Sequence, residues 1–180
     1  MPRDVVLKTP AMPVAERRAW IEGEPLPANI GALLDAAAAE AGDRLAWSFF
    51  EIGETATYAT LKRRVNGLAR ALLGQGVAKS THVAVMLPNV PAMPMTWLAL
   101  ARLGAVMVPV NPSYSPRELA FVVNDSDSEY MVIHQDCLAT LDAALADGSI
   151  AVLRGRIFVV GGEGAGGFRR WDDLAGDELE

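Results

Sequence analysis

Four short apolar runs rich in β-branched residues, separated by helix-like stretches, constrain this chain more than any other feature. The runs lie at 82–87, 105–110, 129–134 and 156–160, and helical patterns at 91–103, 115–125 and 136–146 separate them. Because the runs do not alternate between apolar and polar residues, we expect strands that are buried on both faces. The pattern predicts an α/β fold, with a mostly parallel sheet flanked by helices on both faces.

The chain before the first run shows other patterns. Residues 1–27 carry proline and charge without a sustained period, which predicts an extended or loosely packed lead-in. Asn29 is a candidate N-cap for an amphipathic helix that ends at Gly42. The stretch 45–58 predicts two short strands joined at Gly53, and a helix over 59–74 follows. Further along, Ser115 and Glu118 have the spacing of a capping box.

Composition and charge exclude several classes of protein. Of the 180 residues, 51% are hydrophobic and 21% are charged, and the net charge of −6 argues against a nucleic-acid-binding protein, which needs a basic face. We find no secretory signal, and the most apolar stretch, 95–110, contains Arg102 and Pro109, so we expect no membrane span. A single cysteine, Cys137, excludes an intramolecular disulfide. These features predict a soluble, cytoplasmic chain.

The stretch FVVGGEGAGGF, at 158–168, contains the spacing Gly162-x-Gly164-x-x-Gly167 of a dinucleotide-binding turn. Such a turn needs a helix after the glycines and an acidic residue about 20 residues further on. No helical pattern follows Gly167, and only 13 residues remain after it. We interpret the glycines as a flexible connecting loop.

A second candidate is a calcium loop. Asp125, Asp127 and Glu129 resemble the start of such a loop, and Asp136 falls at its twelfth position. Tyr130 stands where the sharp turn requires glycine. We therefore favour a polar turn between a helix and a strand, with no metal bound.

The remaining candidates also have structural interpretations that we favour. Cys137 could act as a nucleophile near His134, although the two need not meet, and a lone cysteine is usually a small buried side chain. His82 and His134 are too few for a metal site with Cys137. Arg102 is expected to pair with a carboxylate or to reach solvent, with ligand binding as a weaker alternative. Four methionines are expected to fill the core rather than line a substrate tunnel: Met86, Met93, Met95 and Met107.

Two sequence boxes carry a resemblance to a known family. The segment 81–133, THVAVMLPNVPAMPMTWLALARLGAVMVPVNPSYSPRELAFVVNDSDSEYMVI, and the upstream box TYATL at 57–61 resemble the adenylate-forming acyl-CoA synthetases, also called AMP-binding enzymes. The resemblance covers about residues 28–147, with one departure at Pro94. The boxes are interpreted as structural signatures, carried by Thr57, Tyr58, Leu61, Pro88, Asn89, Gly104, Pro109, Asn111 and Pro112.

The resemblance implies two half-reactions in a parent enzyme. A carboxylic acid would attack MgATP to give an acyl-adenylate, and coenzyme A would then displace AMP to form a thioester. The resemblance places the catalytic groups, including the phosphate loop, downstream of Glu180. It thus implies an N-terminal fragment that binds no cofactor itself, is inactive, and self-associates through exposed apolar surface.

The resemblance also suggests three regions: the extended lead-in at 1–27, an α/β subdomain of the AMP-binding N-terminal domain at 28–160, and at 161–180 a glycine-rich loop with a truncated connection toward the missing phosphate loop. Two alternatives stay open from the residues. One is a stand-alone, non-catalytic α/β module that binds a ligand or partner. The other is a small dinucleotide-binding domain that uses the glycine loop.

Overall fold

The computed structural model describes residues 13–23, 25–152, 154–162 and 167–175. Its main sheet has the strand order β4-β3-β5-β6-β7, and every neighbouring pair is parallel. The strands are β3 (His82–Met86), β4 (Val106–Pro109), β5 (Tyr130–His134), β6 (Ile157–Val160) and β7 (Arg169–Arg170). The predicted parallel sheet is confirmed.

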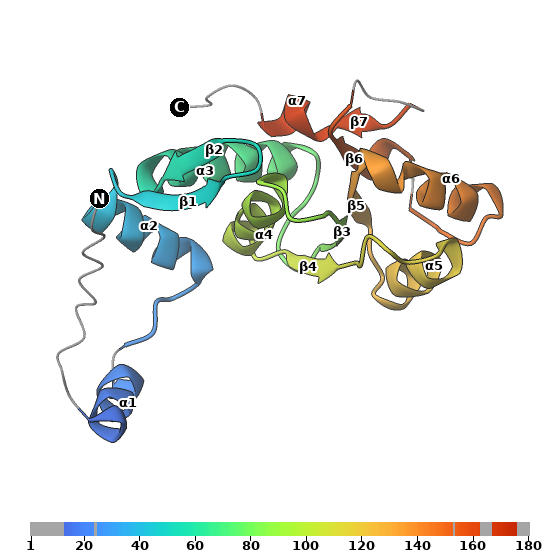
Figure 1. Cartoon of the computed structure of the whole chain (residues 1–180). Helices are drawn as coiled ribbons and strands as arrows, with labels where there is room; N and C mark the ends of the chain where they lie inside the picture. Colours follow the sequence, from blue (N-terminus) through green and yellow to red (C-terminus); the bar gives the residue numbers. More distant parts are fainter. Residues whose placement is uncertain (1–12, 24, 153, 163–166, 176–180) are drawn as a thin grey trace.

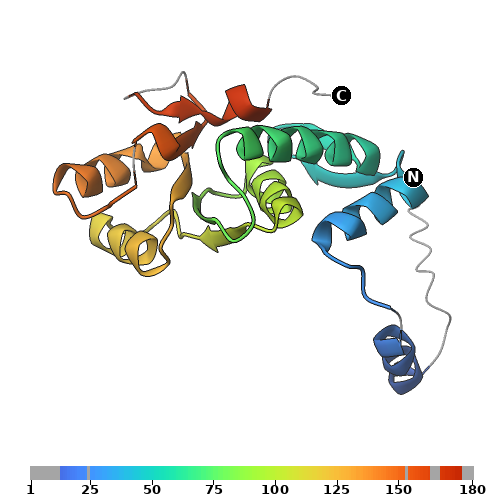
Figure 2. The same cartoon turned by 180° about the vertical axis from the view of Figure 1, so that it is seen from behind.

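Helices cover both faces of this sheet (Figures 1 and 2). On one face lie α3 (Tyr58–Gly74), α4 (Ala92–Leu103) and α7 (Trp171–Ala175), and on the other lie α5 (Pro116–Asp125) and α6 (Leu138–Ala146). Neighbouring strand residues point into different cores: Val83 and Val85 join the first, and Ala84 and Met86 the second. Because both sets are buried, the strands show no polar alternation, as the sequence predicts.

A smaller unit packs beside the main sheet. Helix α2 (Ile30–Ala41) begins at Asn29, whose side-chain oxygen accepts the backbone N–H of Ala32 at 2.8 Å. Strands β1 (Leu45–Phe49) and β2 (Glu54–Thr57) then form an antiparallel hairpin, with Gly53 in its turn at φ +68°. The predicted helix and the two joined strands are confirmed.

The lead-in differs from the expected extended chain. Residues Val14–Gly23 form helix α1. None of the side chains of this helix is buried. Its sequence, VAERRAWIEG, has no apolar stripe long enough to indicate a packed helix. The prediction of extended structure is therefore wrong at 14–23. The alternative prediction of loose packing agrees with the exposed side chains of the helix.

Polar contacts tie three helices together. Arg102 of α4 donates to both carboxylate oxygens of Asp35 in α2, at 2.9 and 3.2 Å, and to the Gly31 carbonyl at 3.2 Å. Lys62 of α3 lies 3.1 Å from the same carboxylate. The expected carboxylate partner of Arg102 is thus Asp35, and this network fixes α2 against α3 and α4.

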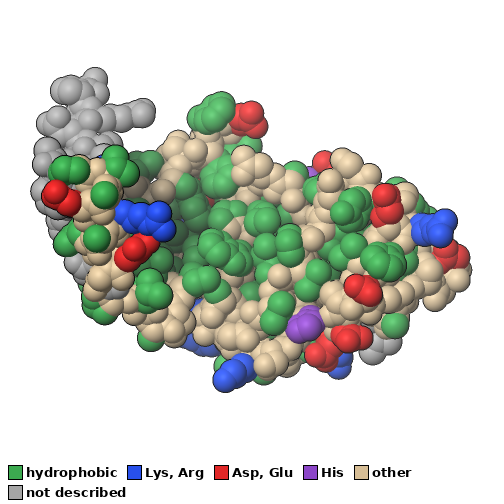
Figure 3. All heavy atoms as spheres, turned by 90° about the horizontal axis from the view of Figure 1, so that it is seen from below, with side chains coloured by type: hydrophobic (Ala, Val, Ile, Leu, Met, Phe, Trp, Pro, Cys, Tyr) green, Lys and Arg blue, Asp and Glu red, His purple; other side chains and the backbone are tan. Residues whose placement is uncertain are grey.

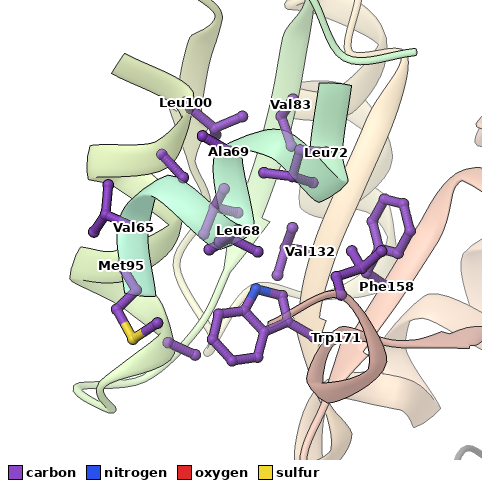
Figure 4. Packing of buried hydrophobic residues seen from close by; sticks show 14 of the residues in the cluster. Val65, Leu68, Ala69, Leu72, Val83, Met95, Leu100, Val132, Phe158 and Trp171 are labelled. Atoms are coloured by element: carbon purple, nitrogen blue, oxygen red, sulfur yellow. The ribbon is translucent and has the colours of Figure 1, made fainter. Parts of the chain in front are cut away.

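The chain after the glycine loop belongs to the core. Strand β7 adds to the sheet beside β6, and α7 then packs over the first core, where Trp171 and Leu174 are buried. The Trp171 indole N–H donates to the Thr96 hydroxyl of α4 at 3.0 Å, and the indole lies among the core side chains of Figure 4. The expectation that no helix follows the glycines is therefore wrong, because five residues suffice for a helix when packing stabilises them.

Gly104 ends α4 in the left-handed conformation, at φ +71°, and a Cβ there would lie 3.3 Å from Lys79 Cγ. We expect Gly104→Ala to lower the free energy of unfolding by about 1–2 kcal/mol, the cost of a left-handed conformation in a residue with a Cβ. Gly74→Ala is the control, because nothing lies within 4 Å of that position and its φ is not positive. Urea titration measures the free energy of unfolding of both variants. An unchanged value for Gly104→Ala would contradict the predicted backbone strain.

The Trp171–Thr96 hydrogen bond lies in the core, where the Thr96 side chain is fully buried. Trp171→Phe leaves that hydroxyl without its indole donor, and we expect a loss of about 1–3 kcal/mol in the free energy of unfolding. Thr96→Val in the same protein should recover part of the loss. Denaturant unfolding of the two single variants and the double variant gives the coupling, and strictly additive losses would exclude the bond as a stabilising contact.

The hydrogen bond from Arg102, followed by that from Lys62, lowers the pKa of Asp35 below its ordinary value of 3.8. A lowered pKa stabilises the fold above the unfolded pKa, and this contribution is lost as the pH falls through the folded pKa. Asp35→Asn should therefore destabilise the protein near pH 7 and have a smaller effect near pH 3. Urea midpoints of both proteins across this range check the prediction, and a difference that does not vary with pH would contradict it.

Candidate functional site

The carboxyl ends of the parallel strands form the candidate site. The chain passes from β3 to β4 on one side and then crosses to β5 on the other side of β3, so the order of connection reverses between β3 and β5. Ligands of open α/β sheets bind in the crevice outside the carboxyl ends of the strands at such a reversal. The loops that meet there begin with Pro88 and Asn89 after β3 and with Gln135 after β5.

The loops after β3 and β4 form tight turns. The Val90 N–H donates to the Pro88 carbonyl at 2.8 Å, which leaves the neighbouring Asn89 exposed. The Asn111 side-chain oxygen accepts the Ser113 N–H at 2.9 Å, as in an Asx turn. The structure therefore places Pro88, Asn89 and Asn111 at one edge of the sheet, in turns that direct the chain away from it.

The loops after β5 and β6 contact each other. Gly161 and Gly162 have φ of +79° and +72°, and a Cβ at Gly162 would lie 2.6 Å from the Gln135 side-chain oxygen. Both positions thus need glycine for the backbone conformation, whereas the flexible end of the Gln135 side chain could shift away from a Cβ. No sequence pattern around Gln135 could have predicted this contact, because Gly161 and Gly162 lie in another loop.

These glycines do not form the dinucleotide turn that was considered from the spacing. Gly164 lies outside the described residues, and β7 stands between Gly167 and α7. The N-terminus of α7 therefore does not follow the glycines directly, as a phosphate-binding turn requires.

The thiol of Cys137 is buried at the same edge. Its S–H donates to the Pro112 carbonyl, with 3.8 Å between the sulfur and the oxygen, while His134 contacts Asp136 at 3.2 Å. Burial, and then the charge of Asp136, raises the pKa of this thiol above its ordinary value. A thiol that stays protonated is a poor nucleophile, so the structural interpretation of Cys137 is favoured.

The carboxylates of the candidate calcium loop are divided between opposite edges of the sheet. Asp125, Asp127 and Glu129 precede β5, whereas Asp136 follows it, and five strand residues separate the two ends. Such a strand is roughly 16 Å long, too far for Asp136 to share an ion with the other three. Across the described ranges of the chain, no group of three His, Cys, Asp or Glu residues is placed to hold a metal ion.

His82 has a structural partner. Its Nδ1 contacts the Ser126 carbonyl, and because a carbonyl only accepts, this nitrogen carries the proton. Two of the four methionines, Met86 and Met95, are buried in the cores. Met93 and Met107 pack partly buried against the first core, which agrees with a packing role.

The remaining signature residues lie at the boundaries of elements. Thr57 caps α3, its hydroxyl accepting the Thr60 N–H at 3.2 Å, and the Tyr58 N–H donates to the Arg44 carbonyl at 3.0 Å. Leu61, one turn further on, is buried in the first core.

Gly104 and Pro109 mark the two ends of the segment that contains β4. Gly104 ends α4, and its carbonyl accepts the Ser80 N–H at 2.9 Å. Pro109 ends β4, the edge strand of the sheet. In this position a residue without an N–H loses no ladder hydrogen bond.

Among the described residues, the candidate site consists of strand ends and turns. It contains no recognisable group of catalytic side chains. The loops after β3, β4, β5 and β6, as far as they are described, contain neither lysine nor arginine. No helix among the described residues is long and apolar enough to cross a membrane.

Comparison with known proteins shows what this arrangement belongs to. The family of AMP-binding enzymes matches residues 34–160. A long-chain-fatty-acid–CoA ligase of Salmonella typhimurium is 34% identical over 104 residues, which cover 57% of this chain and 18% of the relative. A crotonobetaine/carnitine–CoA ligase of Proteus mirabilis is 34% identical over 76 residues, or 42% of this chain and 15% of the relative.

Solved structures agree with these matches. A long-chain-fatty-acid–CoA ligase of Archaeoglobus fulgidus superposes with a TM-score of 0.73 at 29% identity, covering 84% of this chain and 30% of that one. An anthranilate–CoA ligase superposes with a TM-score of 0.75 at 20% identity over 86% of this chain, which shows a shared fold.

The matched segments thus span less than a fifth of the length of the two sequence relatives. The family match itself covers more than half of the chain and includes the parallel sheet from β3 to β6. This chain belongs to the family of AMP-binding enzymes.

Proposed function

We propose that this chain is the N-terminal α/β part of an ATP-dependent carboxylate–CoA ligase. The observation that carries the proposal is the family match over residues 34–160, together with a matched segment that covers only 18% of a related long-chain-fatty-acid–CoA ligase. The full-length enzyme would use ATP with Mg²⁺ to form an acyl-adenylate from a carboxylic acid and would then transfer the acyl group to coenzyme A.

The part described here supplies the scaffold of that enzyme. ATP phosphates require clustered donors and positive charge, and Mg²⁺ requires carboxylate ligands. The described residues do not fit these groups, because the loops at the carboxyl edge carry no basic side chain and the described carboxylates form no metal cluster. The turns at Pro88, Asn89, Asn111 and Pro112 instead end the strands at the edge where a ligand of such a sheet binds.

The fixed geometry of this edge is the contribution that we assign to the chain. The Gln135 side chain lies beside Gly161 and Gly162, so the loops after β5 and β6 are neighbours, and the Cys137–Pro112 contact joins the loop after β4 to the start of α6. Catalytic groups supplied by the rest of the polypeptide would rest on this edge. The substrate class that the relatives share is a carboxylic acid.

The test compares the 180-residue chain with the full-length polypeptide encoded by its reading frame. With MgATP and a panel of fatty, aromatic and carnitine-like acids, we expect the full-length protein to release pyrophosphate and, after addition of coenzyme A, to form a thioester. The 180-residue chain alone should do neither, because the catalytic groups lie elsewhere.

Two results would contradict the proposal. The first is pyrophosphate release by the 180-residue chain itself, which would place the catalytic groups within it. The second is a stop codon directly after Glu180, which would favour the separate, non-catalytic α/β module.

A further inference from the structure

An apolar groove runs along the open edge of the main sheet. It has a volume of about 520 Å³ and is lined by the start of α2, one side of α4 and one face of β4, through Ile30, Trp97, Ala101, Ala105, Met107 and Pro109. We call it the β4 groove. Seen from this side of the molecule, hydrophobic side chains gather across its middle (Figure 3).

The exposure of two large side chains at this groove is costly in water. Trp97 is 44% exposed and Ile30 is 37% exposed, although both belong to helices whose opposite sides are packed. On α4, Ala99 and Leu100 are buried in the first core, whereas Trp97 and Ala101 line the groove, so the helix is apolar on a second side as well. A helix with this distribution requires cover on a second side.

The backbone of β4 indicates which kind of contact can cover the groove. The Val106 and Val110 N–H groups donate to the carbonyls of Thr81 and Val85, each at 2.9 Å, so alternate residues of β4 point their N–H toward β3. Met107 and Pro109 therefore point their backbone nitrogens to the open edge, and proline has no N–H to offer. An added strand would lose a ladder bond at Pro109, so the groove is suited to side-chain packing and not to strand addition.

Three occupants can be distinguished. A second copy would place one concave groove against another under two-fold symmetry, and two hollows do not fill each other. A fatty acid would be poorly enclosed, because Trp97 and Pro109 on the rim are exposed, whereas ligand pockets bury most of their ligand. The third occupant is more of the same polypeptide, and relatives five times as long as the matched region supply ample length.

We propose that the β4 groove is the docking surface for the part of the full-length protein that lies outside residues 1–180, which inserts an apolar surface between α2, α4 and β4. This inference rests on the proposed function only in requiring a longer polypeptide. It assigns the apolar surface expected from the sequence to one face, on which Trp97 is the largest of the lining side chains.

The experiment measures access to the groove in the full-length protein. Ala101→Cys lies in the groove, and Ala139→Cys, on the exposed side of α6, is the matched control. N-ethylmaleimide modification of each site is followed by peptide mass spectrometry, in the full-length protein and in the 180-residue chain. We expect the rate at position 101, relative to position 139, to fall at least about tenfold in the full-length protein.

A second pair of variants tests the energetics. Trp97→Glu places a charge in the proposed contact, whereas Phe121→Glu changes a side chain that is 67% exposed on α5, outside the groove. In the full-length protein we expect Trp97→Glu to lower the unfolding midpoint more than Phe121→Glu does, because burying an unpaired charge is costly. In the 180-residue chain the difference between the two variants should be smaller than in the full-length protein, because Trp97 is already 44% exposed there.

Each alternative gives a different result. Equal relative rates at position 101 in both proteins would overturn the proposal, as would the absence of any encoded residues outside 1–180. Protection that rises with protein concentration would replace it with a second copy, and protection only after addition of palmitate would replace it with a fatty acid. Protection in a protein without ligase activity would leave the docking surface standing and reject the proposed function.

Discussion

Burial of β3 and β5 on both faces is the constraint on which the rest of this structure depends. Val83 and Val85 enter one core while Ala84 and Met86 enter the other, so neither core can form without the same strand. Every helix that packs on the sheet must therefore present an apolar side to one of two cores. The helix–strand alternation of the sequence follows from this requirement, because parallel strands need a crossover between them.

Much of this arrangement could be predicted, because its causes are local. The capping box of Ser115 and Glu118 forms as its spacing predicts, with the Glu118 carboxylate accepting the Ser115 N–H at 2.8 Å. Helix α4 tolerates Pro94 because this residue lies in the first turn, where its missing N–H costs no hydrogen bond. In both cases the residues that decide the structure are neighbours in the sequence.

The parts that could not be predicted depend on distant partners. Helix α7 has only five residues, and it is stabilised by the burial of Trp171 beside Thr96 rather than by a pattern of its own. Gly161 and Gly162 have positive φ where their loop passes Gln135 of another loop, and nothing in the sequence around them indicates this neighbour. The candidate site shows the same limit: the family signatures were visible in the sequence, and in this structure they form caps and turns.

The Trp171–Thr96 contact also bears on how the chain folds during synthesis. The two residues are 75 positions apart, and the first core that they close includes side chains from α3, α4, β3 and β5. On the ribosome, Trp171 and Leu174 emerge after all of these, so the first core stays open toward α7 until these two residues have left the exit tunnel. Contacts of such long range are slow to form. In this interval the sides of α3 and α4 that α7 later covers are exposed to solvent.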